Sequence, residues 1–176
     1  MNIIKHAEGV YEIKGFLDKE LKDALLLNAV QNLDWNTIQP GNTVKDMGDK
    51  LYFKMEPVYK NIETLFTNIE SIVYARDLRK LTNSEFMWPH TDGGSPDDPR
   101  KIVFGIAIYL NDDFTGGELI YPDLGLSVTP KAGSMVIHDA HLKHQVFPVV
   151  EGERYSITTF VFGDESTKFD PNPFVA

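Results

Sequence analysis

The sequence predicts a mainly β protein with flanking helices, an α+β chain whose strands form a double-sheet jelly roll. Helical patterns are confined to residues 1–70, and from Ser71 onward short apolar runs alternate with turns rich in Gly, Pro, Asn and Asp. Runs of strands after runs of helices are typical of one β-architecture with helices packed on its outside. The length of 176 residues favours one domain, 1–176.

Residues 1–70 are expected to be a helical support for that core. Asp18 is a suitable N-cap for a first helix that runs to about Leu33. A second helix is expected to begin near Pro57, because proline is tolerated in a first turn. Apolar residues recur at helical spacing in both segments: Leu21, Leu25 and Leu26 in the first, and Val58, Ile62, Leu65, Phe66 and Ile69 in the second.

The segment 35–49 contains Pro40, Gly41 and Gly48 and is expected to be a loop that reaches over a site on the β core. That core is expected to span residues 71–162. Residues 163–176 are expected to be a tail on the surface.

The segment Ile102–Leu110 is expected to be a buried strand with two different faces. Its even positions are all large and apolar, which indicates a face packed against another layer. Its odd positions include Gly105, Ala107 and Tyr109, and small residues on one face of a strand leave space. That space predicts a ligand cavity, and close approach of a second backbone is the alternative.

His90-Thr91-Asp92 and the distant His144 are candidate metal ligands. Residues two apart on an extended strand point to the same face, so His90 and Asp92 can bind one ion. Two histidines and one carboxylate form the open-sided ligand set of non-heme Fe(II) oxygenases. A His-x-Asp seen alone is more often a hydrogen-bonded pair than a metal site. The prediction of a metal site therefore depends largely on the candidate residues that follow later in the sequence.

Other histidines compete for the third ligand position. His138, His141 and His144 are spaced by three, which on a helix would place them on one side as a separate metal site. Apolar runs on both sides favour strands instead, with 138–144 as the connecting turn. His144 begins the second run and is preferred, His141 and then His138 are the alternatives, and His6 is interpreted as a surface residue.

Arg154 is the candidate partner for a dicarboxylate co-substrate. Its planar guanidinium pairs a carboxylate bidentately and keeps its charge when buried. Such a charge-assisted contact contributes roughly 1.5–3 kcal/mol, enough to select a dicarboxylate over a monocarboxylate. Strand alternation places Ser156 and Thr158 on the face of Arg154, so their hydroxyls could share that carboxylate.

From about Phe86 to Phe162 the chain resembles the catalytic core of the prolyl 4-hydroxylase group of Fe(II)/2-oxoglutarate dioxygenases. Six pieces match in order: His90-Thr91-Asp92, Ile108-Tyr109-Leu110-Asn111, Gly116-Gly117-Glu118-Leu119, Thr129-Pro130-Lys131-Ala132-Gly133-Ser134, His144 with Pro148-Val149, and Gly152-Glu153-Arg154-Tyr155. The resemblance implies a double-stranded β-helix, iron ligation by His90, Asp92 and His144, and a 2-oxoglutarate contact from Arg154. It also implies a role for Tyr109 near the same carboxylate.

The resemblance implies that Fe(II), 2-oxoglutarate and dioxygen are required, with ascorbate as a candidate reductant. It favours a prolyl residue of a protein or peptide as substrate. Free amino acids or small metabolites, a cupin-type dioxygenase, and a catalytically silent metal-binding jelly roll are the alternatives. Aspartate at position 92 argues against a halogenase, which needs that coordination position for halide. Trp88 shares the parity of the ligands, and Arg100 lies in the expected loop 93–100, so both are candidate substrate contacts.

Composition indicates a compact enzyme. The formal charge of −9 argues against a nucleic-acid partner, because phosphate contacts need clustered Lys and Arg. The sequence has no cysteine, which excludes disulfides and thiolate zinc sites. The first residues lack a signal-peptide pattern and no apolar run reaches membrane-spanning length, so no membrane contact and a cytoplasmic location are expected.

Overall fold

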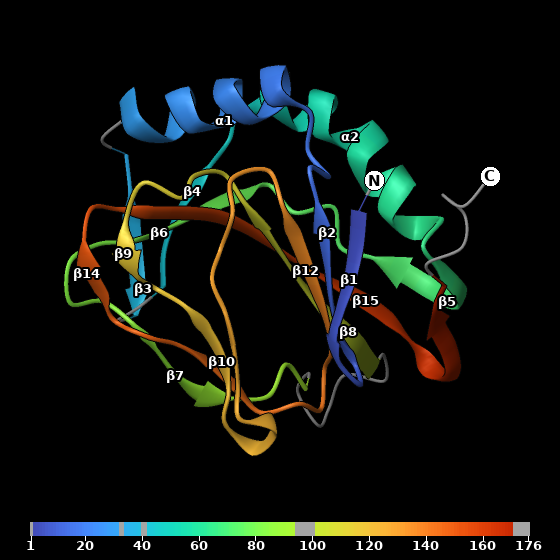
Figure 1. Cartoon of the computed structure of the whole chain (residues 1–176). Coiled ribbons are helices and arrows are strands. Elements are labelled where there is room, and N and C mark those ends of the chain that lie inside the picture. Colours follow the sequence, from blue (N-terminus) through green and yellow to red (C-terminus); the bar gives the residue numbers. More distant parts are fainter. Residues whose placement is uncertain (1, 32–33, 40–41, 94–100, 171–176) are drawn as a thin grey trace.

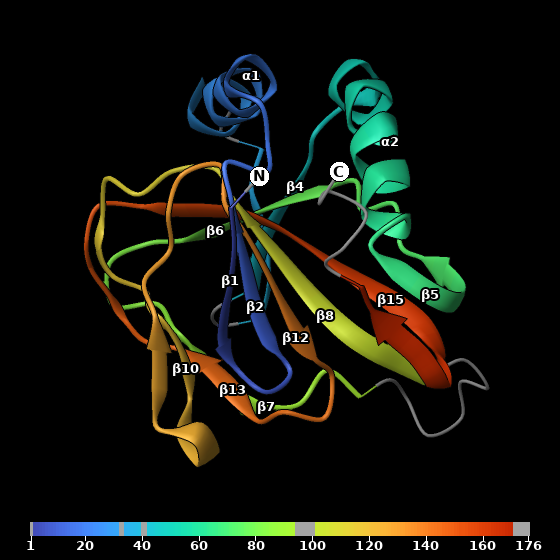
Figure 2. The ribbon, with the colours of Figure 1, turned by 45° about the vertical axis from the view of Figure 1, so that its right-hand side comes forward.

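The computed structural model describes residues 2–31, 34–39, 42–93 and 101–170. Its described part has three layers, with two helices over one face of a large sheet and a smaller sheet against the other face (Figures 1 and 2). This arrangement confirms the predicted mainly β jelly roll with helices packed on its outside.

The large sheet has nine strands in the described residues. In spatial order they are β1 (Asn2–Ala7), β2 (Val10–Lys14), β12 (Met135–Asp139), β8 (Lys101–Tyr109), β15 (Arg154–Phe169), β6 (Asp77–Leu81), β4 (Asn42–Asp46) and β3 (Asn36–Gln39), and β5 (Phe66–Ile72) pairs with β15. β8 and β15 lie at its centre, and the pairings between its described strands are antiparallel.

The smaller sheet orders β11 (Leu126–Val128), β10 (Leu119–Tyr121), β13 (His144–Val146) and β7 (Met87–His90). β14 (Val149–Glu151) and β9 (Thr115–Gly116) form a two-stranded ribbon, and a 3-10 turn, Pro122–Leu124, joins β10 to β11. The site described below lies where β7 and β13 face the large sheet.

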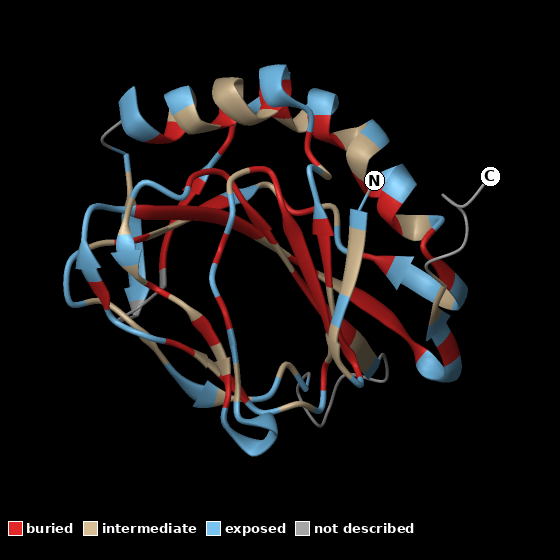
Figure 3. Ribbon diagram, viewed as in Figure 1, coloured by how far each residue is buried: buried red, intermediate tan, exposed pale blue. Residues whose placement is uncertain are grey.

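Two apolar cores separate the layers. One lies between the helices and the large sheet and includes Leu25, Tyr59 and Ile157. The other lies between the two sheets and includes Tyr109 and Tyr121. Buried residues accordingly follow the strands and the sheet-facing sides of the helices (Figure 3). On β8, Phe104, Ile106 and Ile108 enter the helix-side core, whereas Ala107 and Tyr109 face the small sheet, as the sequence alternation predicts. Val103, near the start of the strand, departs from the pattern and packs against the helix-side core.

Helix α1 (Lys19–Gln31) begins where the sequence predicts. The Leu21 backbone N–H donates to Asp18 Oδ1 at 2.9 Å, so Asp18 caps the helix. Leu21 and Leu25 are buried on its inner side.

Helix α2 spans Asp49–Glu63. The predicted start near Pro57 is therefore wrong, because Pro57 lies inside the helix. Proline has no N–H to donate to the carbonyl of Phe53, four positions earlier, and its ring crowds that carbonyl, so the helix needs other support at this point. Met55 and Tyr59 are fully buried on either side of the proline, and this packing holds the helix together across it. The predicted helix also continued too far, since Phe66 already belongs to β5.

The described part of segment 35–49 is also not a loop. It contains the β3–β4 hairpin, and β4 pairs with β6 at the edge of the large sheet, whereas Pro40 and Gly41 lie outside the described residues. The helical support expected for 1–70 likewise contains strands, because β1 and β2 join the large sheet through β12.

The expected surface tail at 163–176 is wrong for its first part. β15 continues to Phe169 and pairs there with Phe66 of β5, and the Phe66 and Phe169 rings pack with centroids 5.6 Å apart. Residues 171–176 lie outside the described residues. No helix in the described part of the chain combines the length and apolar character needed to cross a membrane.

Candidate metal centre

A cavity of about 140 Å³ lies between the two sheets. The small sheet contributes His90 and His144, and the large sheet contributes Tyr109 from β8 and Arg154 from β15. Residues more than 60 positions apart in the sequence therefore share one enclosed space because antiparallel pairing brings their strands together.

His90, Asp92 and His144 come together as the sequence predicts. His90 ends β7 and His144 begins β13, and the two are direct partners in the antiparallel pair. One ligand atom from each of the three residues lies within 4.8 Å of the others. Asp92 Oδ1 is 3.6 Å from His90 Nε2 and 3.6 Å from His144 Nε2. One ion can therefore be bound by all three side chains.

Backbone carbonyls orient both imidazoles. His90 Nδ1 lies 2.7 Å from the Trp88 carbonyl oxygen, and His144 Nδ1 lies 2.9 Å from the Leu142 carbonyl oxygen. A carbonyl only accepts, so each Nδ1 carries the proton and each Nε2 presents a lone pair to the centre. Metal ligation through Nε2 requires this tautomer.

The charges also suit a cation. Burial lowers the pKa of His144 to about 4, helped by the neighbouring His138, so its imidazole is neutral near pH 7. Burial alone would raise the pKa of Asp92, but the hydrogen bond from His138 and the electrostatic influence of the surrounding histidines outweigh burial and lower the pKa. The site thus presents one carboxylate and, at His144, a neutral imidazole nitrogen.

Arg154 and Tyr109 form a second polar group in the cavity. Both are buried, and the Arg154 guanidinium carbon lies 5.0 Å from the centroid of the Tyr109 ring. Arg154 Nη1 donates to Ser156 Oγ at 3.3 Å. Arg154 Nε and the Tyr109 hydroxyl have no hydrogen-bond partner among the described residues. Buried donors are rarely left unpaired, so this pair fits the distal carboxylate of a dicarboxylate ligand.

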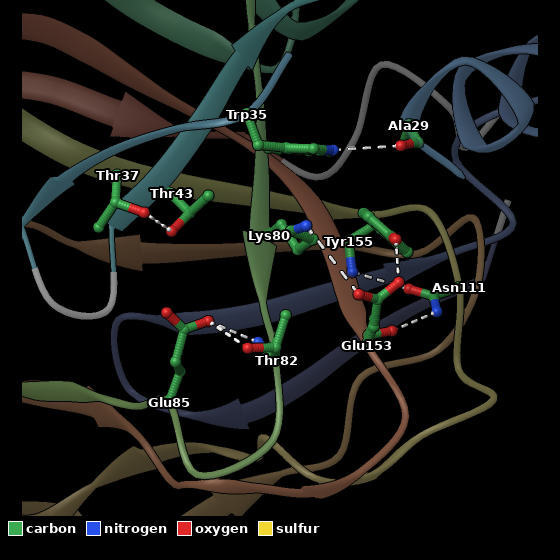
Figure 4. A network of polar contacts seen from close by, with 10 residues as sticks. All are labelled: Ala29, Trp35, Thr37, Thr43, Lys80, Thr82, Glu85, Asn111, Glu153 and Tyr155. Atoms are coloured by element: carbon green, nitrogen blue, oxygen red, sulfur yellow. Dashed lines mark hydrogen bonds and ion pairs between the residues drawn. The ribbon is translucent and has the colours of Figure 1, made fainter. Parts of the chain in front are cut away.

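Neighbouring residues hold Arg154 in place. The Asn111 side chain binds the backbone of both neighbours of Arg154 (Figure 4). It accepts a hydrogen bond from the Tyr155 N–H at 2.8 Å and donates one to the Glu153 carbonyl at 2.7 Å. Gly117 leaves room for the side chain, because a Cβ there would lie 3.0 Å from Arg154 Cδ. The sequence motifs that contain Asn111 and Gly116-Gly117 thus help to position the first residues of strand β15.

The remaining predicted site residues are placed as follows. Ser156 and Thr158 line the cavity on the face of Arg154, as strand alternation predicts. Trp88 does not line it and is 69% exposed. The pairing of β7 with β13 shifts register between the pairs His90–His144 and Met87–Val146, and this irregularity breaks the parity on which the prediction for Trp88 depended. Arg100 and most of loop 93–100 lie outside the described residues.

His138 is the site residue that the sequence ranked last. It belongs to β12 and not to a connecting turn, and its Nε2 lies 2.8 Å from Asp92 Oδ2. His141 is exposed on the link between β12 and β13. His6 is also no free surface residue, because it is only partly exposed and its Nε2 lies 2.9 Å from Glu12 Oε2. Strand assignment of residues 135–139, followed by pairing with Gly105, is the signal that could have located His138.

The fold and the site together define a double-stranded β-helix protein with a candidate 2-His-1-carboxylate metal centre. No family model matches the chain. A PKHD-type hydroxylase of Cupriavidus pinatubonensis is 32% identical over 104 residues, which is 54% of this chain and 46% of that protein. The chain thus spans about half the length of that curated relative.

Solved structures show the same fold. The collagen prolyl hydroxylase of Paramecium bursaria Chlorella virus-1, solved with 2-oxoglutarate, superposes with a TM-score of 0.61 at 20% identity, over 89% of this chain and 97% of that one. A Trichoplax adhaerens prolyl hydroxylase, solved with a hypoxia inducible factor peptide fragment, gives 0.68 at 16% identity, over 90% and 85%. These likenesses confirm the chain's similarity to the prolyl 4-hydroxylase-like group of Fe(II)/2-oxoglutarate dioxygenases.

Proposed function

We propose that the protein is an Fe(II)- and 2-oxoglutarate-dependent dioxygenase that hydroxylates an unactivated C–H bond. One observation carries the proposal: a 2-His-1-carboxylate site shares its cavity with two buried donors that lack partners, the Tyr109 hydroxyl and Arg154 Nε. When bound, Fe(II) and 2-oxoglutarate supply the oxidising chemistry, in which dioxygen is consumed, succinate and carbon dioxide leave, and one oxygen atom enters the substrate.

Each residue has a defined part in this proposal. His90, Asp92 and His144 hold the iron and leave its other positions to the 2-oxo acid and dioxygen. Arg154 pairs with the distal carboxylate, and Ser156 and Thr158 offer hydroxyls on the same face. Burial raises the pKa of Tyr109, so its hydroxyl keeps its proton and donates to that carboxylate.

We propose a prolyl residue of a protein or peptide as the substrate. The similarity to prolyl hydroxylases supports this choice, and one of them was solved with a peptide fragment bound. An exposed aromatic side chain near a candidate ligand also supports a polypeptide partner. Trp88 lies two residues before His90, is 69% exposed, and packs edge-on against Phe86 with ring centroids 4.8 Å apart.

Product analysis tests this proposal. The Fe(II)-loaded protein is supplied with 2-oxoglutarate and either proline-containing peptides or free proline, with and without ascorbate. Succinate should form in step with a peptide that gains the mass of one oxygen atom. Arg154→Ala should raise the KM for 2-oxoglutarate by about tenfold or more, the equivalent of a lost charge-assisted contact.

Tyr155→Phe is the matched control. Tyr155 is the next residue of β15, lies on the opposite face and hydrogen-bonds to Glu153 (Figure 4), so this variant should keep the wild-type KM. Hydroxylation of free proline alone would replace the peptide with a small-molecule substrate. Tight iron binding without any consumption of 2-oxoglutarate would favour a cupin-type enzyme or a silent metal-binding module.

A further inference from the structure

The two oxygens of Asp92 face different partners. Oδ1 points toward the ligand nitrogens of His90 and His144, 3.6 Å from each. Oδ2 lies 2.8 Å from Nε2 of His138, a third histidine that is only 4% exposed. One oxygen is thus available to an ion, and the other is already engaged by the protein.

The polarity of this contact follows from hydrogen-bond chemistry. An ionised carboxylate only accepts, so His138 Nε2 carries the proton, and in that tautomer Nδ1 is the acceptor. The Tyr121 hydroxyl lies 2.9 Å from that Nδ1 and therefore donates to it. Tyr121 is fully buried, and burial raises its pKa, so it keeps the proton that it donates. Hydrogen bonds then run in one direction, from Tyr121 through His138 to Asp92.

Gly105 provides the room for this chain. It is the direct partner of His138 in the β12–β8 pair. A Cβ at Gly105 would lie 2.0 Å from Asp92 Oδ2 and 2.4 Å from His138 Nε2, closer than real Cβ contacts allow. The small residue on this strand therefore makes space for the Asp92–His138 contact, within the cavity that the sequence predicted.

We propose that His138, oriented by Tyr121, is a positioning residue that holds Asp92 Oδ2 away from the ion, so that the carboxylate binds iron through Oδ1 alone. This inference rests on the proposed function. A carboxylate that used both oxygens would fill one of the coordination positions that the 2-oxo acid and dioxygen need. Hydrogen-bonded partners of metal ligands orient those ligands in this way in other metal sites.

Co(II) binding to the apoprotein tests the proposal without turnover. His138→Ala should weaken Co(II) binding by about 10- to 100-fold, and Tyr121→Phe by about tenfold at most. His138→Gln should recover most of the affinity, because a glutamine amide can donate from near the position of Nε2. 2-Oxoglutarate binding to the Co(II)-loaded protein should fall in the same order.

His6→Ala is the matched control, because His6 also lies on the large sheet and pairs with a carboxylate, Glu12, but contacts no ligand. It should leave Co(II) affinity unchanged. A second readout is the long-range ¹H–¹⁵N spectrum of the apoprotein, in which His138 should carry its proton on Nε2. A proton on Nδ1 would overturn the assigned direction of the chain.

Three further results are decisive. Equal Co(II) affinity in His138→Ala and His6→Ala would remove the positioning role. A His138→Gln variant as weak as His138→Ala would indicate that His138 ligates the ion itself. If the wild type binds Co(II) tightly but not 2-oxoglutarate, the proposed function fails, while the comparison of His138 with His6 still decides this inference.

Discussion

His144 shows how burial prepares a single side chain for metal binding. Its ring is almost fully enclosed, its Nδ1 donates to the Leu142 carbonyl, and its Nε2 faces Asp92. Burial lowers its pKa from 6.5 to about 4, so protons do not compete with a metal for Nε2 near neutral pH. The same shift has a consequence for the stability of the apoprotein.

Apoprotein stability should decrease as the pH falls from about 6.5 toward 4. The unfolded chain binds a proton at His144 near pH 6.5, whereas the folded chain does so only near pH 4, so acid favours unfolding across that window. Urea unfolding at pH 7.5 and pH 5 measures the effect. His144→Asn should flatten the pH dependence, and His141→Asn, at an exposed position, should not; equal slopes in both variants would contradict the account.

The residues of the site differ in how far the sequence could predict them. His90 and Asp92 are two positions apart, so local geometry relates them, and an ordered set of motifs adds His144 and Arg154. His138 contacts Asp92 across 46 positions of sequence through the register of β12 and β8, which no local pattern gives. For Trp88 only the parity argument failed, because a register irregularity in the β7–β13 pair keeps its side chain out of the cavity.

At the level of elements, the beginning of β15 is the critical segment. The Asn111 amide bonds to the backbone on both sides of Arg154 (Figure 4). The register of β15 with β8 sets Ser156 opposite Tyr109. The loop after β8 therefore fixes where the guanidinium enters the cavity. Asn111 is itself buried, so its hydrogen bonds have no competition from water.

Asn111→Ala should weaken 2-oxoglutarate binding to the Co(II)-loaded protein by about tenfold and leave Co(II) affinity unchanged. It should also lower the free energy of unfolding by about 1–3 kcal/mol, because the Tyr155 N–H and Glu153 carbonyl lose their partner. Calorimetry and urea unfolding measure the two effects. Thr82→Ala removes the hydrogen bond to Glu85 in the same region and should not change 2-oxoglutarate affinity; a parallel loss in both variants would refute the role given to Asn111.

Element boundaries were harder to predict than element types. The first helix was located by its cap at Asp18, a local signal. The second was misplaced because Pro57 looks like a helix start, whereas tertiary packing of Met55 and Tyr59 carries the helix through it. The last strand was cut short at residue 162, since its pairing with β5 depends on residues about 100 positions away.

At the scale of the whole molecule, the three layers have different roles, because some support the large sheet and others form the site. The helices and the helix-side core support one face of the large sheet (Figure 2). The opposite face forms the cavity with the small sheet. Each central strand therefore carries structural residues on one side and site residues on the other, as Ile157 and Ser156 do on β15. This division lets a rigid scaffold hold the ligands at fixed positions.

The central claim is that one cavity binds both Fe(II) and 2-oxoglutarate. Anaerobic titration of the apoprotein with Fe(II) and then 2-oxoglutarate, followed by visible absorption, tests it most directly. A weak, saturable charge-transfer band of a chelated 2-oxo acid should appear; His144→Ala should abolish it, and Arg154→Ala should shift its saturation to higher 2-oxoglutarate. Tight iron binding with no band at any 2-oxoglutarate concentration would contradict the account.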